Sequence, residues 1–440
     1  MASTYLSRTN GTPTDVQKYT FSAWVKRSNL GNQALVQANG DPSTLNYVDY
    51  IEFNSSNQLR FLIYHNSNLG EYVTNAVYRD TSAWYHVVVS VDTTQLTSSN
   101  RVKFYVNGEQ ITSFATETAP SQNQTLQFNT VDSVYSVGVQ YSTGFNQKYF
   151  DGEMAHVHFI DGTAYDADTF GETDATTGIW KPKTAPSVTY GTNGFFLKFE
   201  NSGAMGTDSS GNGNNFSVSG NLTQTIDTPS NVFATMNAID NSSVTLSNGN
   251  LTCSCASPSG IRSTLGVTAG KYYMEVKYQS TTSMCGVVAM EQAVTTQAIG
   301  ATIFGQSGGS APELFLNGSA ETDYSSAGAF SSNDIMQIAL DMDTNTVYFG
   351  KNGSWFGGTS WTESTPTTGH TLTSGYTYGV RASTGSGTSV NIWNFGNGYF
   401  GTTAVSSAQN PDDGIGIFEY DVPTGYRALC TKSINAEEYS

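Results

Sequence analysis

The segment Asn333 to Phe356, NDIMQIALDMDTNTVYFGKNGSWF, decides the fold because it predicts three short strands joined by two tight turns. Apolar residues occupy positions 336, 338, 340 and 342, and the alternation resumes at Val347 and Phe349. A period of two places these side chains on one face of a strand. The second turn contains Asn352-Gly353, the dipeptide that best tolerates the two positive φ angles of a type I′ hairpin. We therefore predict a three-stranded meander.

A second copy of this pattern lies upstream. The stretch WYHVVVSVDTT (84–94) leads through a polar loop into RVKFYVNGEQI (101–111). Both copies run from a strand through an Asp-Thr turn into a V-x-F strand and an Asn-Gly turn. Between positions 50 and 64, YIEFNSSNQLRFLIY predicts a further hairpin in the same region. We predict two all-β domains in tandem, each built around one meander.

Length and composition agree with this division. A chain of 440 residues has room for two or three domains, and we predict two. Its 44 glycines, 25 tyrosines and 23 phenylalanines favour strands and turns over helices. The stretch DTPSNVFAT contains Pro229 and little periodicity. We therefore predict a first domain over 1–220, a linker over 221–235, a second domain over 236–432 and a tail over 433–440.

The formal charge of −17 argues against nucleic acid as a partner, because only 19 Lys and Arg are present and none are clustered. No apolar stretch approaches the roughly 20 residues of a membrane helix, so we expect no membrane insertion. The N-terminal MASTYLSRTNGT lacks the apolar region of a signal peptide. The four cysteines lack zinc-site spacing, and we expect free thiols made in a reducing cytoplasm.

Several motifs carry a family resemblance. In the first region, WYHVVVSVD, VKFYVNG, FDGEMAHVHFIDGTAY and DSSGNGNN resemble laminin-G-like, concanavalin-A-like jelly rolls. In the second, SNGNLT, STLGVTAGKYYMEVKY, DMDTNTVYFGKNGSW and PTGYRALCT are similar to SPRY domains. The resemblance implies an all-β fold of two tandem concanavalin-A-like jelly-roll sandwiches.

The order of the two domains, with DTPSNVFATMN between them, resembles tail-fibre-like or capsid-associated proteins of tailed phages, especially marine ones. The resemblance implies a non-enzymatic protein of the virion surface, made in the host cytoplasm. It further implies other virion proteins as partners, a homo-oligomer, and adsorption to a bacterial surface glycan. Two alternatives remain open at this point: a capsid or tail decoration protein without a host ligand, and a glycan-active hydrolase.

One departure from the family order concerns Phe195 to Asn215, which contains FFLKFEN and DSSGN. In laminin-G-like domains of this kind such a stretch usually precedes the other strands, whereas here it follows them. It could complete the first sheet, since the terminal strands of a jelly roll lie close together, or it could open the second domain.

A hydrolase would need paired acids, because retaining glycosidases hold two carboxylates about 5–5.5 Å apart. The nearest candidates are Glu419 with Asp421, and Asp341 with Asp343. Neither pair has a third acid at strand spacing, and Asp343 fits the hairpin turn better. We therefore predict no enzymatic activity.

Two groups could hold a metal ion. Asp208, Asn212 and Asn214 offer oxygen ligands in a glycine-rich loop, which suits a structural calcium ion, although no glutamate completes an EF-hand. An Asx-turn is the alternative reading of that loop. His156 and His158 share one strand face, but the sequence places no obvious third ligand nearby, and the alternative is a solvated outer sheet face. We expect no other cofactor.

The ligand-binding candidates are Tyr324, Trp355, Trp361 and Arg381, which the sequence places in or beside loops. The resemblance to SPRY domains, which bind through their loop surface, suggests these four. Sugars stack on aromatic rings, and protein partners anchor on Trp, Tyr and Arg. The alternative is that the same side chains pack the rim of the sandwich.

Overall fold

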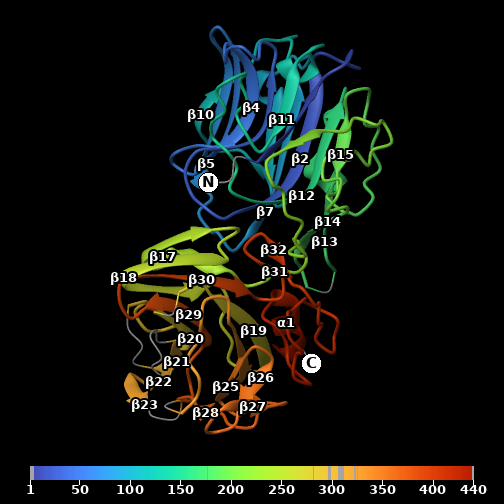
Figure 1. The fold of residues 1–440 in the computed structure, drawn as a ribbon. Coiled ribbons are helices and arrows are strands. Elements are labelled where there is room, and N and C mark those ends of the chain that lie inside the picture. The colour runs from blue at the N-terminus through green and yellow to red at the C-terminus, as the bar shows by residue number, and fades with distance from the viewer. Residues whose placement is uncertain are drawn as a thin grey trace. The chain divides into compact units, whose positions relative to one another are not determined.

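Strands make up 47% of the chain and helices only 4%, which confirms the all-β prediction. The computed structural model describes residues 4–175, 177–280, 282–295, 299–305, 312–321, 324 and 326–438. The chain divides into two units, Met1–Gln224 and Thr225–Ser440. Figure 1 draws the first unit in blue to green and the second in yellow-green to red. The division falls inside the segment 221–235, where the linker was predicted.

The first unit consists of two sheets. The eight-stranded sheet has the order β10 (Phe114–Thr118), β6 (Asn68–Val77), β5 (Gln58–His65), β4 (Tyr47–Phe53), β3 (Gln33–Asn39), β11 (Val134–Val137), β1 (Tyr5–Thr9), β16 (Ser217–Ser219). The six-stranded sheet has the order β15 (Phe195–Leu197), β12 (Gly152–Asp161), β2 (Lys18–Arg27), β7 (Trp84–Asp92), β8 (Val102–Val106), β9 (Glu109–Ile111). A small hairpin of β13 (Gly171–Thr173) and β14 (Trp180–Pro182) follows, with short 3-10 turns at Ser98–Asn100, Gln127–Asn129 and Ala167–Thr169.

The first core lies between these two sheets. Phe61 comes from the eight-stranded sheet, Phe21 and Phe159 come from the six-stranded sheet, and all three are fully buried in one cluster. Period-two alternation produces this arrangement, since every second side chain of a strand points to the same face. Burying a side chain of this size stabilises the fold by roughly 1.5–3 kcal/mol. The meander predicted over 84–111 is confirmed as β7, β8 and β9, with φ of 52° at Asn107 and 86° at Gly108.

The segment Phe195 to Asn215 completes the first sandwich. Strand β15 pairs antiparallel with β12, and Leu197 forms a further bridge to Asp208. Directly after this segment, β16 pairs with β1, so that Ser219 lies opposite Tyr5. The first of the two sequence alternatives is therefore confirmed.

The second unit is built on one continuous hydrogen-bonded sheet. Its main order is β23 (Ser319–Glu321), β22 (Glu313–Leu316), β21 (Gly300–Phe304), β20 (Ser283–Ala289), β29 (Tyr378–Thr384), β18 (Thr252–Ser263), β30 (Thr388–Asn394), β19 (Lys271–Tyr278), β24 (Ile335–Asp341), β25 (Thr346–Lys351), β26 (Ser354–Phe356), β27 (Trp361–Glu363). Three further strands join it: β17 (Met236–Ser247) on β18, β28 (His370–Thr371) on β25, and β33 (Arg427–Ala428) on β19. A separate pair, β31 (Tyr399–Phe400) and β32 (Thr403–Ala404), and one helix, α1 (Thr431–Glu438), complete it.

The deciding segment forms β24, β25 and β26, as predicted. Positive φ angles mark its turns, with 51° at Asn345, 51° at Asn352 and 88° at Gly353. Met336, Ile338 and Leu340 point into the second core, where they meet buried residues of β18, β20 and β29. The meander therefore supplies one wall of that core.

The opposite face of this wall is covered by the C-terminal part of the chain. Phe418 and Tyr426 pack there with Tyr273 of β19 and Phe233, which shows that residue 233 of the predicted linker belongs to the second unit. The segment predicted as a tail, 433–440, is helical up to residue 438, and Ser433 is fully buried. Among the described residues, no helix is long and apolar enough to cross a bilayer. All four cysteines are buried and unbridged.

Candidate functional site

The outer face of the eight-stranded sheet carries an ordered grid of side chains across β4, β5 and β6. The register aligns Glu52 with Arg60, Tyr50 with Leu62 and Glu71, and Val48 with Tyr64 and Asn68. Alternate residues of the same strands, Ile51, Phe61 and Tyr72, point into the core. Strand alternation therefore holds a grid of polar and apolar side chains on the outer face, above the hydrophobic core.

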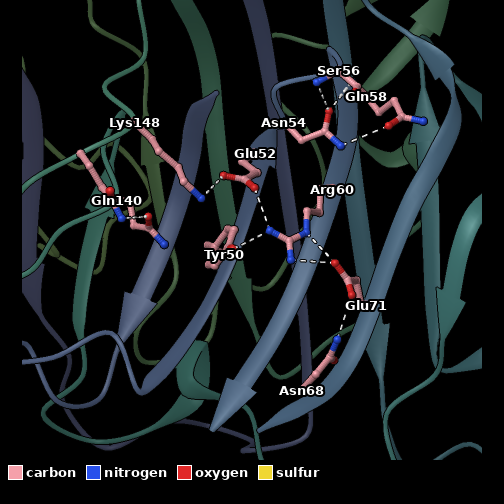
Figure 2. A network of polar contacts seen from close by, with 11 residues as sticks. Tyr50, Glu52, Asn54, Ser56, Gln58, Arg60, Asn68, Glu71, Gln140 and Lys148 are labelled. Carbon is pink, nitrogen blue, oxygen red and sulfur yellow. Dashed lines mark hydrogen bonds and ion pairs between the residues drawn. The ribbon is translucent and has the colours of Figure 1, made fainter. Parts of the chain in front are cut away.

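Arg60 is the centre of this grid (Figure 2). Its Nε donates to Glu71 Oε1 at 2.7 Å, and its Nη1 donates to the Tyr50 hydroxyl at 2.8 Å and to Glu52 Oε1 at 3.1 Å. Asn68 Nδ2 donates to the other Glu71 oxygen at 2.8 Å. These contacts fix the planes of both the guanidinium and the Glu71 carboxylate.

Lys148 reaches the same network from the loop after β11. Its Nζ donates to Glu52 Oε2 at 2.7 Å and lies 4.8 Å from the centre of the Tyr50 ring. Glu52 is only 1% exposed, whereas Arg60, Glu71 and Lys148 are 24%, 20% and 18% exposed. Glu52 is therefore the buried anchor, and the other three present atoms to the outside.

An apolar patch adjoins the network. Val48, Tyr50 and Leu62 are buried together on this face, and the half-buried ring of Tyr64 packs at their edge. Burial raises the pKa of Tyr50, so its hydroxyl keeps its proton. The site thus combines fixed donors, fixed acceptors and an aromatic ring within three strands. That combination suits a ligand rich in hydroxyl groups.

Tyr324 and Trp361, two of the predicted ligand-binding residues, lie together but serve as packing. Tyr324 is fully buried and stacks on Phe356 at a centroid distance of 3.9 Å. Trp361 lies 5.3 Å from Tyr324 and donates through Nε1 to the Gly328 carbonyl at 3.0 Å. The geometry favours the alternative of packing within the sandwich, because the faces of Tyr324 are already occupied by other rings.

Trp355 and Arg381, the other two candidates, are not brought to the same place. Trp355 is 2% exposed and packs under the C-terminal segment, in a different cluster from Tyr324. Arg381 of β29 is 4% exposed, and its Nη1 donates to Ser383 Oγ at 2.8 Å. The four residues therefore do not form one loop surface, since three of them are buried in different places: Tyr324 among neighbouring rings, Trp355 under the C-terminal segment, and Arg381 on β29.

The predicted calcium ligands already have partners within the protein. Asp208 Oδ1 accepts from the backbone N–H of Phe196 and Ser210, and Oδ2 accepts from the N–H of Asn214 at 2.8 Å. Asn212 Nδ2 donates to backbone carbonyls, and Asn214 Oδ1 accepts from Arg8 Nη2 at 2.8 Å. The Asx-turn alternative fits these contacts better than a calcium site, because a guanidinium already occupies the Asn214 oxygen.

The alternative of a solvated face is wrong for His158, whereas His156 is half-buried beside Phe196. His158 is 1% exposed and stacks on Phe196 at 3.9 Å, while its Nδ1 lies 3.0 Å from the Tyr190 hydroxyl. Residues between β12 and β15 form a cover over the six-stranded sheet, and two of them, Phe170 and Tyr190, pack against the His158 ring. Within the described ranges, no three His, Cys, Asp or Glu side chains come together as a possible metal site.

His86 lies under the same cover, beside a serine. Its Nδ1 accepts from Trp180 Nε1 at 3.0 Å, so the proton of the neutral ring is on Nε2, which lies 2.9 Å from Ser22 Oγ. A protonated Nε2 donates to the serine and cannot remove its proton. The pair is therefore in the wrong tautomer for nucleophilic catalysis.

Three of the four carboxylates considered for hydrolysis have structural contacts, and the fourth, Asp421, is exposed. Asp341 pairs with Lys271 at 3.0 Å, Asp343 accepts from Gly270 N–H at 2.9 Å, and Glu419 accepts from Ser406 N–H at 2.7 Å. Burial raises the pKa of another acid, Glu275, to about 7. Its two oxygens nevertheless accept from the N–H groups of Glu419 and Tyr420, each at 2.9 Å, so it anchors the C-terminal segment.

The Arg60 network was not predicted from the sequence. Tyr50, Glu52 and Arg60 occupy alternating positions of YIEFNSSNQLRFLIY, where alternation predicts only that a face is not core, and Asn68 and Glu71 come from the next strand. Lys148 lies 96 residues beyond Glu52 in the chain, and only the fold brings the two together. The one available signal was Glu and Arg on adjacent strands of the predicted hairpin, which favours a cross-strand pair.

Comparison with known proteins gave one family match, which lies within the first unit. Residues 2–169 match the family described as "Concanavalin A-like lectin/glucanases superfamily". This range contains β1 to β12 and the whole Arg60 network. A search of curated protein sequences gave no match.

Three solved structures illustrate the level of structural similarity. The SPRY domain of human HERC1 has 16% identity and a TM-score of 0.28, over 36% of this chain and 96% of that one. A CBM40 of a Ruminococcus gnavus IT-sialidase, bound to α2,3-sialyllactose, has 16% identity and a TM-score of 0.25, over 33% and 83%. A carbohydrate-binding protein of Bacteroides ovatus, described as putative, has 12% identity and a TM-score of 0.29, over 50% and 59%. Similarity this low says nothing about ligand or activity.

Proposed function

We propose that the first unit binds carbohydrate on the outer face of β4, β5 and β6. The observation that supports this most directly is the preorganised Arg60 network beside the half-buried ring of Tyr64. Sugars are recognised by rings that stack on their apolar faces and by planar groups that bind pairs of hydroxyls. The match of this unit to a superfamily that includes lectins agrees with the proposal.

Binding of the full-length chain to an array of oligosaccharides tests the proposal. Tyr64→Ala removes the ring, and Asn68→Ala removes an exposed amide from the same row of the grid. Each substitution should weaken binding about tenfold, because one stacking or hydrogen-bonding contact is worth about 1–1.5 kcal/mol.

Tyr165→Ala is the matched control. Tyr165 is also half-buried, but it packs in the cover of the six-stranded sheet. Its loss should leave the affinity unchanged. Equal losses of affinity in all three variants would assign the effect to folding, and wild-type protein that binds no glycan would refute the proposal.

We propose that this binding is not accompanied by catalysis. The carboxylates of the Arg60 network are bound by Arg60, Lys148 and Asn68, so their geometry is that of structural ion pairs and hydrogen bonds, not that of a positioned general acid and base. Incubation of any bound oligosaccharide with the protein should release no reducing sugar. If the wild-type protein releases reducing sugar and the Glu71→Gln variant does not, this proposal is contradicted.

The biological setting that we propose is the surface of a tailed-phage virion, where several copies would bind a bacterial glycan. This setting depends on the sequence resemblance alone. Many weak sites on one particle reach high avidity through effective concentration. Antibody labelling of purified particles tests the location. If the chain is only a decoration protein, the antibody should label the particle but the chain should bind no glycan. This result distinguishes the decoration alternative from host adsorption.

A further inference from the structure

We infer that the Arg60 site selects neutral glycans and rejects acidic ones, an inference that depends on the carbohydrate-binding function proposed above. The network contains two carboxylates, Glu52 and Glu71, and two cations, Arg60 and Lys148. Within these four residues the charges balance. No excess positive charge is left in the network to attract an anionic sugar.

The individual contacts show how the cations are used. Glu71 Oε1 lies 2.7 Å from both Arg60 Nε and Nη2, while Nη1 is shared between Glu52 and the Tyr50 hydroxyl. Lys148 lies 2.7 Å from Glu52. A sugar carboxylate could bind Arg60 bidentately only by displacing one of its present partners. Displacing Glu71 or Glu52 would leave that acid without its partner, and displacing the Tyr50 hydroxyl would place the ligand's charge beside Glu52.

The partly exposed carboxylate of Glu71 also favours a neutral glycan. Glu71 is 20% exposed, and its Oε2 accepts one hydrogen bond from Asn68 (Figure 2). A carboxylate oxygen can accept a second hydrogen bond, and a sugar hydroxyl can donate it. A sugar carboxylate or sulfate has no proton to donate at neutral pH, and it would be repelled by Glu71. The net charge of −17 adds a repulsive background for polyanions.

The test is an array of matched pairs, each a neutral oligosaccharide and its uronic, sialylated or sulfated counterpart. The full-length chain should bind the neutral member about tenfold or more tightly, as expected when a like charge faces Glu71. Binding of the neutral member should change little with salt, because no charge on the ligand is screened.

Glu71→Gln isolates the acceptor. The substitution keeps the shape of the side chain but replaces one carboxylate oxygen by an amide NH2. The neutral member should bind about tenfold more weakly because an acceptor is lost, and the preference over the acidic member should shrink because the negative charge is lost. Glu117→Gln is the matched control, since it makes the same charge change on the adjacent strand β10. The register places Glu117 opposite the core-facing Tyr72 and therefore on the other side of the sheet from Glu71. It should leave the preference intact.

Asn68→Lys provides a second variant. Asn68 is exposed, and its replacement removes one hydrogen bond to Glu71 but leaves the contacts of Arg60 and Lys148 with Glu52 in place. The added cation should raise the affinity for the acidic member of a pair. Wild-type protein that prefers acidic members would overturn the inference while leaving carbohydrate binding intact. Absence of binding to every glycan would instead refute the proposed function, and equal effects of Glu71→Gln and Glu117→Gln would overturn the role of Glu71.

Discussion

Trp355 shows how one side chain acquires its role from what folds over it. It follows the Asn-Gly turn of the deciding segment and has Tyr273 on one side, with ring centroids 6.3 Å apart. Phe418, from the C-terminal segment, belongs to the same buried cluster. The indole therefore stabilises the attachment of that segment to the sheet and has no face free for a ligand.

We therefore predict that Trp355→Ala lowers the free energy of unfolding by about 3–5 kcal/mol, as expected for a large aromatic side chain lost from a core. Denaturant titration of the full-length chain measures this. Carbohydrate binding by the folded fraction should be unchanged. A variant of normal stability that no longer binds glycan would restore Trp355 as a ligand-binding residue.

At the scale of elements, the cover over the six-stranded sheet has a chemical consequence of its own. Phe170 and Tyr190 of this cover pack against His158, and Trp180 donates to His86. Burial lowers the pKa of His86 from 6.5 to about 3, and burial followed by the neighbouring His156, His86 and Lys198 lowers that of His158. Both rings are therefore neutral in the folded protein at neutral pH.

Acid should destabilise the first unit for this reason. In the unfolded chain these histidines bind protons below about pH 6.5, while in the folded protein they do not, so stability is present above that pH and is lost as the pH falls towards 3. The expected loss is about 1.4 kcal/mol per pH unit for each histidine. Thermal unfolding between pH 7 and 4 measures it.

His158→Phe is the informative variant, because it keeps the stack on Phe196 and removes one titrating group. Its stability should depend less steeply on pH than that of the wild type. An unchanged slope would mean that other groups cause the acid sensitivity.

The elements differ in how far the sequence predicts them. The meanders were predictable because period-two alternation and Asn-Gly turns are local signals, visible without knowledge of the fold. The two covers, 163–194 and the segment after β30, lack periodicity, so nothing in the sequence showed that they would bury His158 and Trp355. For the same reason the sequence suggested that Trp355 was an exposed ligand-binding residue, and it gave no sign that the outer face around Arg60 was more than a solvated sheet face.

At the scale of the whole molecule, each unit has its own core. The cluster around Phe21, Phe61 and Phe159 contains residues of the first unit alone, and the cluster around Ile338 contains residues of the second alone. We therefore predict that residues 1–224 and 225–440, produced separately, each fold and unfold in one cooperative transition. Circular dichroism and chemical-shift dispersion provide the measurement. If either segment lacks a cooperative transition when produced alone, its core depends on the other segment.

The pairing of β1 with β16 brings residue 5 opposite residue 219 in one sheet. The first and last strands of this sandwich are therefore neighbours in one sheet. A module with adjoining ends can be inserted into a surface loop of an unrelated carrier without forcing that loop apart. Recombination could thus move the first sandwich from one carrier protein to another as a single segment, with the outer face of β4, β5 and β6 unchanged.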